Sequence, residues 1–159
     1  MQIQFLADCP EVIGAIACLH QLEMKLGEKS NYHRAIEKFG LRLNRVNLPL
    51  ALVAFADTLP VGSVSLVDSD LPNYPHLKPW LASLFVATPY QKQGIGLQLV
   101  QQIELIASQM GYQQLYLFTW TAEAYYRKLG WTVIDQTQPK ELPESVIMQK
   151  ILSIPEMGL

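Results

Sequence analysis

The most informative part of the sequence is Leu84-Phe-Val-Ala-Thr-Pro-Tyr-Gln-Lys-Gln-Gly-Ile-Gly96. It predicts a strand, a turn broken by proline, and two glycines at the start of an amphipathic helix. The first N–H groups of such a helix lack partners within the helix, and the helix dipole adds partial positive charge there. Glycine at positions 94 and 96 removes side chains that would hold an oxyanion away from these donors. The stretch therefore favours a bound diphosphate, although the same glycines also suit close packing of a helix on a strand.

The elements around this stretch predict an α+β fold with a mixed, mostly antiparallel sheet of about seven strands and about four helices. In the helix expected from about 94 to 110, apolar residues recur at spacings of three and four. Other helices are expected from about 10 to 26, over 31–45 and over 122–129, and strands over 3–6, 50–56, 61–67, 80–86, 113–118, 131–135 and 145–151. The segment 68–79 contains three prolines and predicts a loop, long enough to suggest a function.

Composition limits the classes of protein to consider. The 159 residues are 50% hydrophobic and 16% charged, which predicts one folded domain over 1–159, with a core of about 1–152 and a frayed tail at 153–159. A net charge of −2 lacks the basic excess needed to bind nucleic acid. No apolar run is long enough to cross a membrane and the N-terminus does not resemble a secretory signal, so we expect a cytoplasmic protein. The cysteines and histidines lack the spacing of metal ligands, so no metal is expected.

Two motifs resemble those of the GNAT N-acetyltransferase superfamily. Gln91-Lys92-Gln93-Gly94-Ile95-Gly96 resembles its acyl-CoA signature, Gln/Arg-x-x-Gly-x-Gly/Ala. Ala122-Glu-Ala-Tyr-Tyr-Arg-Lys-Leu-Gly-Trp131 resembles its Ala-x-x-Phe-Tyr-x-x-x-Gly-Phe helix. The competing phosphate-binding patterns fail, because no Lys-Ser/Thr pair follows the glycines and Leu99 stands where a dinucleotide-binding fingerprint needs a third glycine. The resemblance covers roughly residues 80–135.

The resemblance implies an enzyme that moves an acetyl group from acetyl-CoA, its co-substrate, to a primary amine of a small molecule or peptide. The pantetheine arm of CoA would lie in a cleft between two splayed parallel strands and pair with the main chain of the first. The diphosphate would rest on the turn that follows, and the main-chain N–H of Val86 would stabilise the oxyanion. The implied cofactor-binding residues are Leu84, Phe85, Val86, Gln91, Lys92, Gln93, Gly94, Ile95, Gly96 and Leu97.

Tyr126 matches the family tyrosine that acts as general acid. A phenol can protonate the departing sulfur, whose pKa as a thiol is about 8.5. A packed ring with a hydrogen-bonded hydroxyl is the alternative interpretation of Tyr126. Tyr125 aligns with a core aromatic residue of the family.

The general base and the acceptor site are less defined. Several branches of the family carry a glutamate on the strand before the cofactor turn, whereas Leu81-Ala82-Ser83 has no carboxylate. Asp68 and Asp70 are candidates for binding the amine or accepting its proton through water, although aspartates in such loops often form turns. Trp80 is a candidate wall of the acceptor site.

The missing glutamate also supports an alternative function, a catalytically silent acyl-CoA-binding or regulatory module. Homodimers are common among such enzymes, and the sequence leaves the oligomeric state open.

Overall fold

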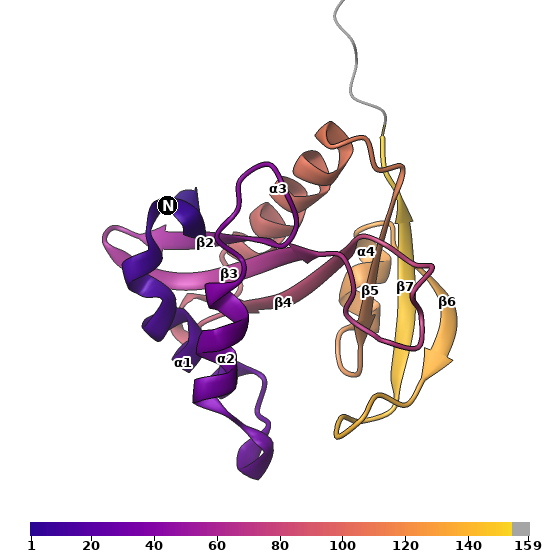
Figure 1. Cartoon of the computed structure of the whole chain (residues 1–159), viewed down its shortest axis with the longest axis horizontal. Helices are drawn as coiled ribbons and strands as arrows, with labels where there is room; N and C mark the ends of the chain where they lie inside the picture. Colours follow the sequence, from indigo (N-terminus) through magenta and orange to yellow (C-terminus); the bar gives the residue numbers. More distant parts are fainter. Residues whose placement is uncertain (154–159) are drawn as a thin grey trace, which may run out of the picture. The chain divides into compact units, whose positions relative to one another are not determined.

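The computed structural model describes residues 1–153, which form seven strands and four α-helices (Figure 1). The strands are β1 (Gln2–Phe5), β2 (Leu50–Ala56), β3 (Leu59–Val67), β4 (Trp80–Val86), β5 (Gln114–Thr119), β6 (Thr132–Thr137) and β7 (Ser145–Ile151). The helices are α1 (Ile13–Glu23), α2 (Tyr32–Gly40), α3 (Ile95–Gln109) and α4 (Glu123–Lys128), with short 3-10 turns at Leu6–Asp8, Pro10–Val12, Gly27–Lys29 and Thr88–Tyr90. No helix in this described range is long and apolar enough to cross a membrane.

The strands form a mixed sheet in the order β1-β2-β3-β4-β5-β7-β6. The pairs β1–β2, β2–β3, β5–β7 and β6–β7 are antiparallel, whereas β4 and β5 run parallel and pair at Trp80 and Tyr116. The predicted fold class is therefore confirmed.

Two compact units can be distinguished within the chain. The first comprises residues 1–67 and 81–103. Here α1 packs against α2 and against β3 (Figure 1). Its core is formed by residues of the first helices and strands, among them Leu6, Ile16, Phe39, Val53, Phe55 and Phe85. Burying these apolar side chains supplies the main driving force for folding this unit.

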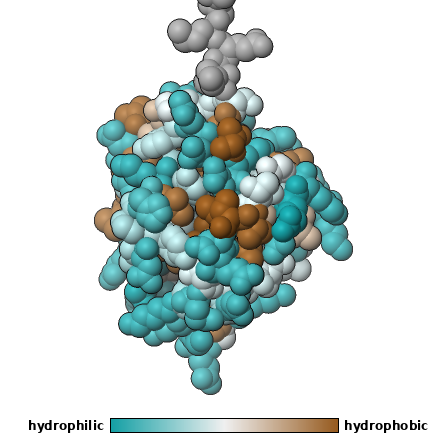
Figure 2. Space-filling model, turned by 90° about the vertical axis from the view of Figure 1, so that its right-hand side faces the viewer, coloured by the Kyte–Doolittle hydropathy of each residue, from teal (hydrophilic) through white to brown (hydrophobic). Residues whose placement is uncertain are grey.

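The second unit comprises residues 68–80 and those from 104 onward. Strand β7 lies between β5 and β6, and α4 belongs to the same unit (Figure 1). Its fully buried side chains include Trp80, Leu115, Leu117, Trp131 and Ile147. Figure 2 faces the side that carries β6 and β7 and shows small apolar patches on a mostly hydrophilic surface. Ile134 and Ile151 are the large exposed apolar residues of these two strands.

Most predicted elements are confirmed within one or two residues, but the helix predicted over 31–45 is too long. Helix α2 begins after Asn31, whose side chain accepts a hydrogen bond from the N–H of Arg34, and it ends at Gly40. Beyond it Arg42 turns inward and is only 8% exposed, whereas Leu41 is 71% exposed. The apolar spacing of a helix face is thus lost after Phe39.

Two further differences concern the ends of elements. Leu26 was expected on the first long helix, but α1 ends at Glu23 and Lys25 follows with a positive φ of 53°. The expected tail at 153–159 lies outside the described residues except for Ser153, whose carbonyl accepts a hydrogen bond from Ser108 Oγ at 2.6 Å.

Candidate active site

The C-terminal end of β4 lies very close to β3 within the first unit. A Cβ added to Gly62 of β3 would lie 2.9 Å from the carbonyl oxygen of Phe85, so only glycine fits there. The N–H of Ala87 donates to Val61 O at 2.8 Å. The carbonyl of Val86 accepts a hydrogen bond from Gln91 Nε2 at 2.9 Å. Both polar groups of the peptide between Val86 and Ala87 are therefore used, which fixes the orientation of this peptide.

The turn at 91–97 follows directly and ends in α3. Lys92 and Gly94 both have positive φ, 63° and 83°. A Cβ at Gly94 would meet nothing within 4 Å, so glycine is needed there for its backbone conformation and not for space. Residues 91–94 are exposed, while Ile95 is buried and anchors the helix.

The turn fits a diphosphate. Its main-chain donors belong to the first turn of a 15-residue helix, where N–H groups lack intrahelical partners and the dipole is positive. Its exposure leaves room for the anion, and the open space beside Gly94 allows close approach to the backbone. The predicted residues Lys92, Gln93, Gly94, Ile95, Gly96 and Leu97 are thus contiguous on one turn of the first unit.

Glu23, at the end of α1, braces the segment between β4 and this turn. Its carboxylate accepts hydrogen bonds from the N–H of Thr88 at 2.9 Å and from Thr88 Oγ1 at 3.0 Å. It also accepts a longer bond from Gln91 Nε2, at 3.4 Å. The Gln91 amide, predicted to contact the cofactor, thus bonds to Val86 and Glu23. Glu23 was missed, because it lies 65 residues before Thr88 and belongs to no motif.

His20 lies edge-on to Phe39 and to Phe85 of β4, with ring centroids 5.5 and 5.7 Å apart. Gln21 Oε1 accepts from the N–H of Asn31, so Gln21 Nε2 donates to His20 Nδ1 at 2.9 Å. Burial, with smaller contributions from Arg42 and Lys38, lowers the pKa of His20 to about 4. His20 is therefore neutral at pH 7, with its proton on Nε2.

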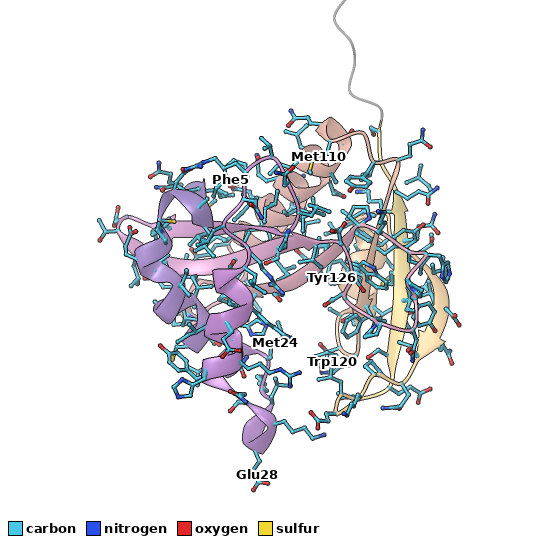
Figure 3. All side chains as sticks on the ribbon, viewed as in Figure 1. Phe5, Met24, Glu28, Met110, Trp120 and Tyr126 are labelled. Atoms are coloured by element: carbon cyan, nitrogen blue, oxygen red, sulfur yellow. The ribbon has the colours of Figure 1, made fainter. Side chains whose placement is uncertain are left out.

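Tyr126 lies on α4 in the second unit (Figure 3). It is 6% exposed and packs edge-on against Tyr125 and Trp131, with ring centroids 5.3 and 5.9 Å away. Burial, with a smaller contribution from Tyr125, raises the pKa of Tyr126, so its hydroxyl keeps its proton at neutral pH. The expectation for Tyr125 is wrong, since this ring is 39% exposed. Successive residues of a helix point about 100° apart, so only one of the pair faces the core.

An ion pair anchors the C-terminal end of α4. Lys150 Nζ donates to Leu129 O at 2.8 Å and lies 2.5 Å from Glu104 Oε1. Both side chains are largely buried, Lys150 being 26% and Glu104 14% exposed. Gly130, with φ of 94°, turns the chain beside Lys150. A cation at the end of a helix also interacts favourably with the helix dipole.

The predicted acceptor residues differ in their surroundings. Trp80 is fully buried, donates its indole N–H to Leu77 O at 2.7 Å and packs against Tyr116 and Phe118, which are the contacts of a core residue. Asp68 is exposed and Asp70 is partly buried, both at the start of the loop 68–79. Residues 1–153 contain no group of three or more His, Cys, Asp or Glu side chains that could hold a metal ion.

Comparison with known proteins identifies the family. A family model described as an acetyltransferase (GNAT) domain matches residues 49–133, more than half of the 159-residue chain. The chain belongs to the GNAT acetyltransferase family. The match includes β4, the turn at 91–97 and α4, and so covers both motifs that resemble those of the family. A search of curated proteins gives no match.

Solved structures confirm the GNAT fold. An aminoglycoside 6′-N-acetyltransferase complexed with coenzyme A is 17% identical, with a TM-score of 0.76 over 95% of this chain and 97% of that chain. YncA from Salmonella typhimurium, solved with its cofactor acetyl-CoA, is 16% identical, with a TM-score of 0.74 over 96% and 94%. The ribosomal-protein-alanine N-acetyltransferase from Brucella melitensis is 17% identical, with a TM-score of 0.74 over 96% and 100%. At these identities the likeness concerns the fold.

Proposed function

We propose that this GNAT protein is an N-acetyltransferase that moves the acetyl group of acetyl-CoA to a primary amine of a small molecule or peptide by direct attack. The observation that carries the proposal is the exposed turn at 91–97, with Gly94 in a left-handed conformation at the start of a long helix. Acetyl-CoA supplies the activated acetyl thioester. The proposal treats the whole chain as one catalytic domain, which is supported by solved acetyltransferase structures that match it over 97% and 100% of their own chains.

In this proposal, the protein binds acetyl-CoA mainly through main-chain groups. The N–H groups of residues 93–97 would bind the diphosphate, and Leu84–Val86 would pair with the pantetheine arm. The N–H of Val86 would stabilise negative charge on the carbonyl oxygen under attack. Support for this role comes from the close approach of Phe85 O, which belongs to the same peptide as the Val86 N–H, to Gly62 of β3.

Tyr126 is the proposed general acid. Burial raises the pKa of its hydroxyl, which therefore keeps its proton at neutral pH and would donate it, as a hydrogen bond or a full transfer, to the departing sulfur of coenzyme A. The acceptor ammonium must lose a proton before it attacks, since its pKa is near 10.4. Ordered water, with Asp68 or Asp70 accepting the proton beyond it, is the proposed route.

The proposal is tested by measuring CoA release with a panel of polyamines, amino acids, aminoglycosides and peptides, followed by mass spectrometry of the product. The mass gain of one acetyl group on an amine is the expected result. An acyl-CoA-binding module without turnover is the second candidate, favoured by the absence of a carboxylate at Leu81–Ser83. It would bind acetyl-CoA, and be stabilised by it, without acetylating any acceptor.

A further inference from the structure

Ser83 has a left-handed backbone conformation within strand β4. Its φ is 55°, a region that residues with a Cβ rarely adopt. Of the five non-glycine residues with positive φ in the described chain, Ser83 alone lies inside a strand. It directly precedes Leu84–Val86, the segment assigned above to the pantetheine arm. Strain of this kind persists only where surrounding contacts hold it.

Arg42 supplies such a contact. Its Nη1 donates to Ser83 Oγ at 3.0 Å and to Ser65 Oγ of β3 at 2.8 Å. The guanidinium also lies over the ring of Phe39, 5.1 Å from its centroid. Arg42 is 8% exposed and Ser65 is fully buried. Hydrogen bonds from a charged donor are stronger than neutral ones, and little water competes with them here.

A left-handed residue in a strand changes the direction of the residues that follow it. As in a β-bulge, the strand bends and its pairing with a neighbour is interrupted, which re-aims the next main-chain groups. In β4 these groups belong to Leu84, Phe85 and Val86. The conformation of Ser83 therefore determines where they point.

We propose that Arg42 is a positioning residue that holds the kink of β4 at Ser83 and thereby aligns the main chain of Leu84–Val86 for the pantetheine arm of acetyl-CoA. This role rests on the proposed function and adds to it a residue that lies outside both family motifs. Arg42 acts through the strand and touches no reacting atom.

The two serines provide a matched test. Ser83→Ala removes the bond to Arg42 but keeps the Cβ that makes the kink strained, whereas Ser83→Gly removes both the bond and the strain. Ser65→Ala removes the other bond of the same Nη1 without affecting the kink. We expect Ser83→Ala to raise the Kd for coenzyme A about tenfold, and Ser83→Gly and Ser65→Ala to stay within about twofold of the unmodified protein.

Calorimetry with coenzyme A and with adenosine diphosphate gives the decisive readout. Adenosine diphosphate carries a diphosphate but no pantetheine arm, so Ser83→Ala should leave its affinity unchanged, while a general loss of structure would weaken both ligands. Arg42→Met should weaken coenzyme A binding at least as much as Ser83→Ala does, and adding Ser83→Gly to Arg42→Met should restore part of it. Urea unfolding of each variant verifies that it is folded during the assay.

Equal affinity of Ser83→Ala and the unmodified protein for coenzyme A would overturn the inference, as would an equal loss in Ser65→Ala. Both outcomes leave the proposed function intact. If the unmodified protein fails to bind coenzyme A, the proposed function itself is wrong, and this inference is wrong with it.

Discussion

The cofactor turn at 91–97 and helix α4 achieve their proposed roles in opposite ways. The turn is exposed and offers main-chain groups whose direction is set by Gly94 and by side chains distant in sequence, such as Glu23. Helix α4 offers one buried side chain, Tyr126, whose protonation is set by its surroundings. Substitutions that alter backbone conformation are therefore the best probes of the turn, whereas substitutions that remove the Tyr126 hydroxyl are the best probes of α4. Changes in the turn should affect affinity, and changes at α4 should affect turnover.

Acid should produce the largest change in stability, through His20, which lies beside Phe85 of the strand that leads into the turn. The pKa of His20 is about 4 in the folded protein and near 6.5 when unfolded, so the unfolded state binds the proton more readily between these values. The free energy of unfolding should stay constant above about pH 6.5 and fall by about 3 kcal/mol on going to pH 4. Urea unfolding at several pH values measures this, with His20→Gln expected to remove most of the loss and exposed His33→Gln to leave it. The same loss in His20→Gln would contradict the assignment.

Tyr126→Phe should give the largest effect on turnover. Loss of the hydroxyl removes the proposed proton donor, so kcat should fall about 100-fold while the Kd for coenzyme A changes little. Steady-state kinetics and calorimetry measure the two quantities. Tyr125→Phe, on the neighbouring exposed ring, is the control and should retain activity. An unchanged kcat in Tyr126→Phe would remove this residue from the mechanism.

Lys150→Met should lower the free energy of unfolding. It leaves the Glu104 carboxylate without its cation in a largely buried place and removes the bond to Leu129 O at the end of α4. Because both side chains keep some exposure, we expect a loss of about 2 kcal/mol in the free energy of unfolding, below the range for fully buried pairs. Chemical denaturation measures it, with Lys128→Met on the exposed end of the same helix as control. Equal stabilities of the two variants would show that the ion pair does not anchor α4.

Gly94→Ala should weaken the binding of coenzyme A about tenfold with little change in kcat at saturation, because φ of 83° is strained for alanine while the site has room for a Cβ. Calorimetry and steady-state kinetics separate the two effects. A drop in kcat with unchanged affinity would show that the turn acts on turnover, as we expect of α4, and not on the binding of coenzyme A.

Glu23→Gln should have the smallest effect on coenzyme A binding. The hydrogen bonds from Thr88 to the Glu23 carboxylate are exposed to solvent, and the amide oxygen of glutamine can still accept one of them. We expect an increase of about threefold in the Kd for coenzyme A. Glu28→Gln, the same change on the exposed side chain labelled in Figure 3, should have none, because within the described residues no hydrogen bond joins Glu28 to the turn. Indistinguishable Kd values for the two variants would rule out a role for α1 in holding the turn.

Features that depend on residues close together in the sequence could be predicted from the sequence alone. The bounds of β4, the helix after Gly94 and the turn between them follow from apolar spacing, proline and glycine, which act within a few residues. The end of α2 at Gly40 could not be predicted, because Arg42 leaves the helix pattern to bond Ser65 and Ser83, 23 and 41 residues away.

In the candidate site, too, local features could be predicted and long-range ones could not. Motif spacing was enough to select Gly94 and Tyr126 as candidates. The burial of Tyr126 and the hydrogen bonds made by Glu23 and Lys150 depend on contacts between distant residues, which leave no local pattern in the sequence. The reversed burial of Tyr125 and Tyr126 also required the structure, since two adjacent tyrosines give the same local pattern whichever one faces inward.

Main-chain N–H groups at the start of α3 are proposed to hold the diphosphate of acetyl-CoA. This binding is tested by following the backbone amide resonances of the protein by NMR during titration with coenzyme A. We predict that the amides of Gln93, Gly94 and Gly96 shift most, and that adenosine diphosphate alone reproduces these shifts. Saturable binding that leaves these amides unperturbed, or no binding at millimolar concentrations, would contradict the account.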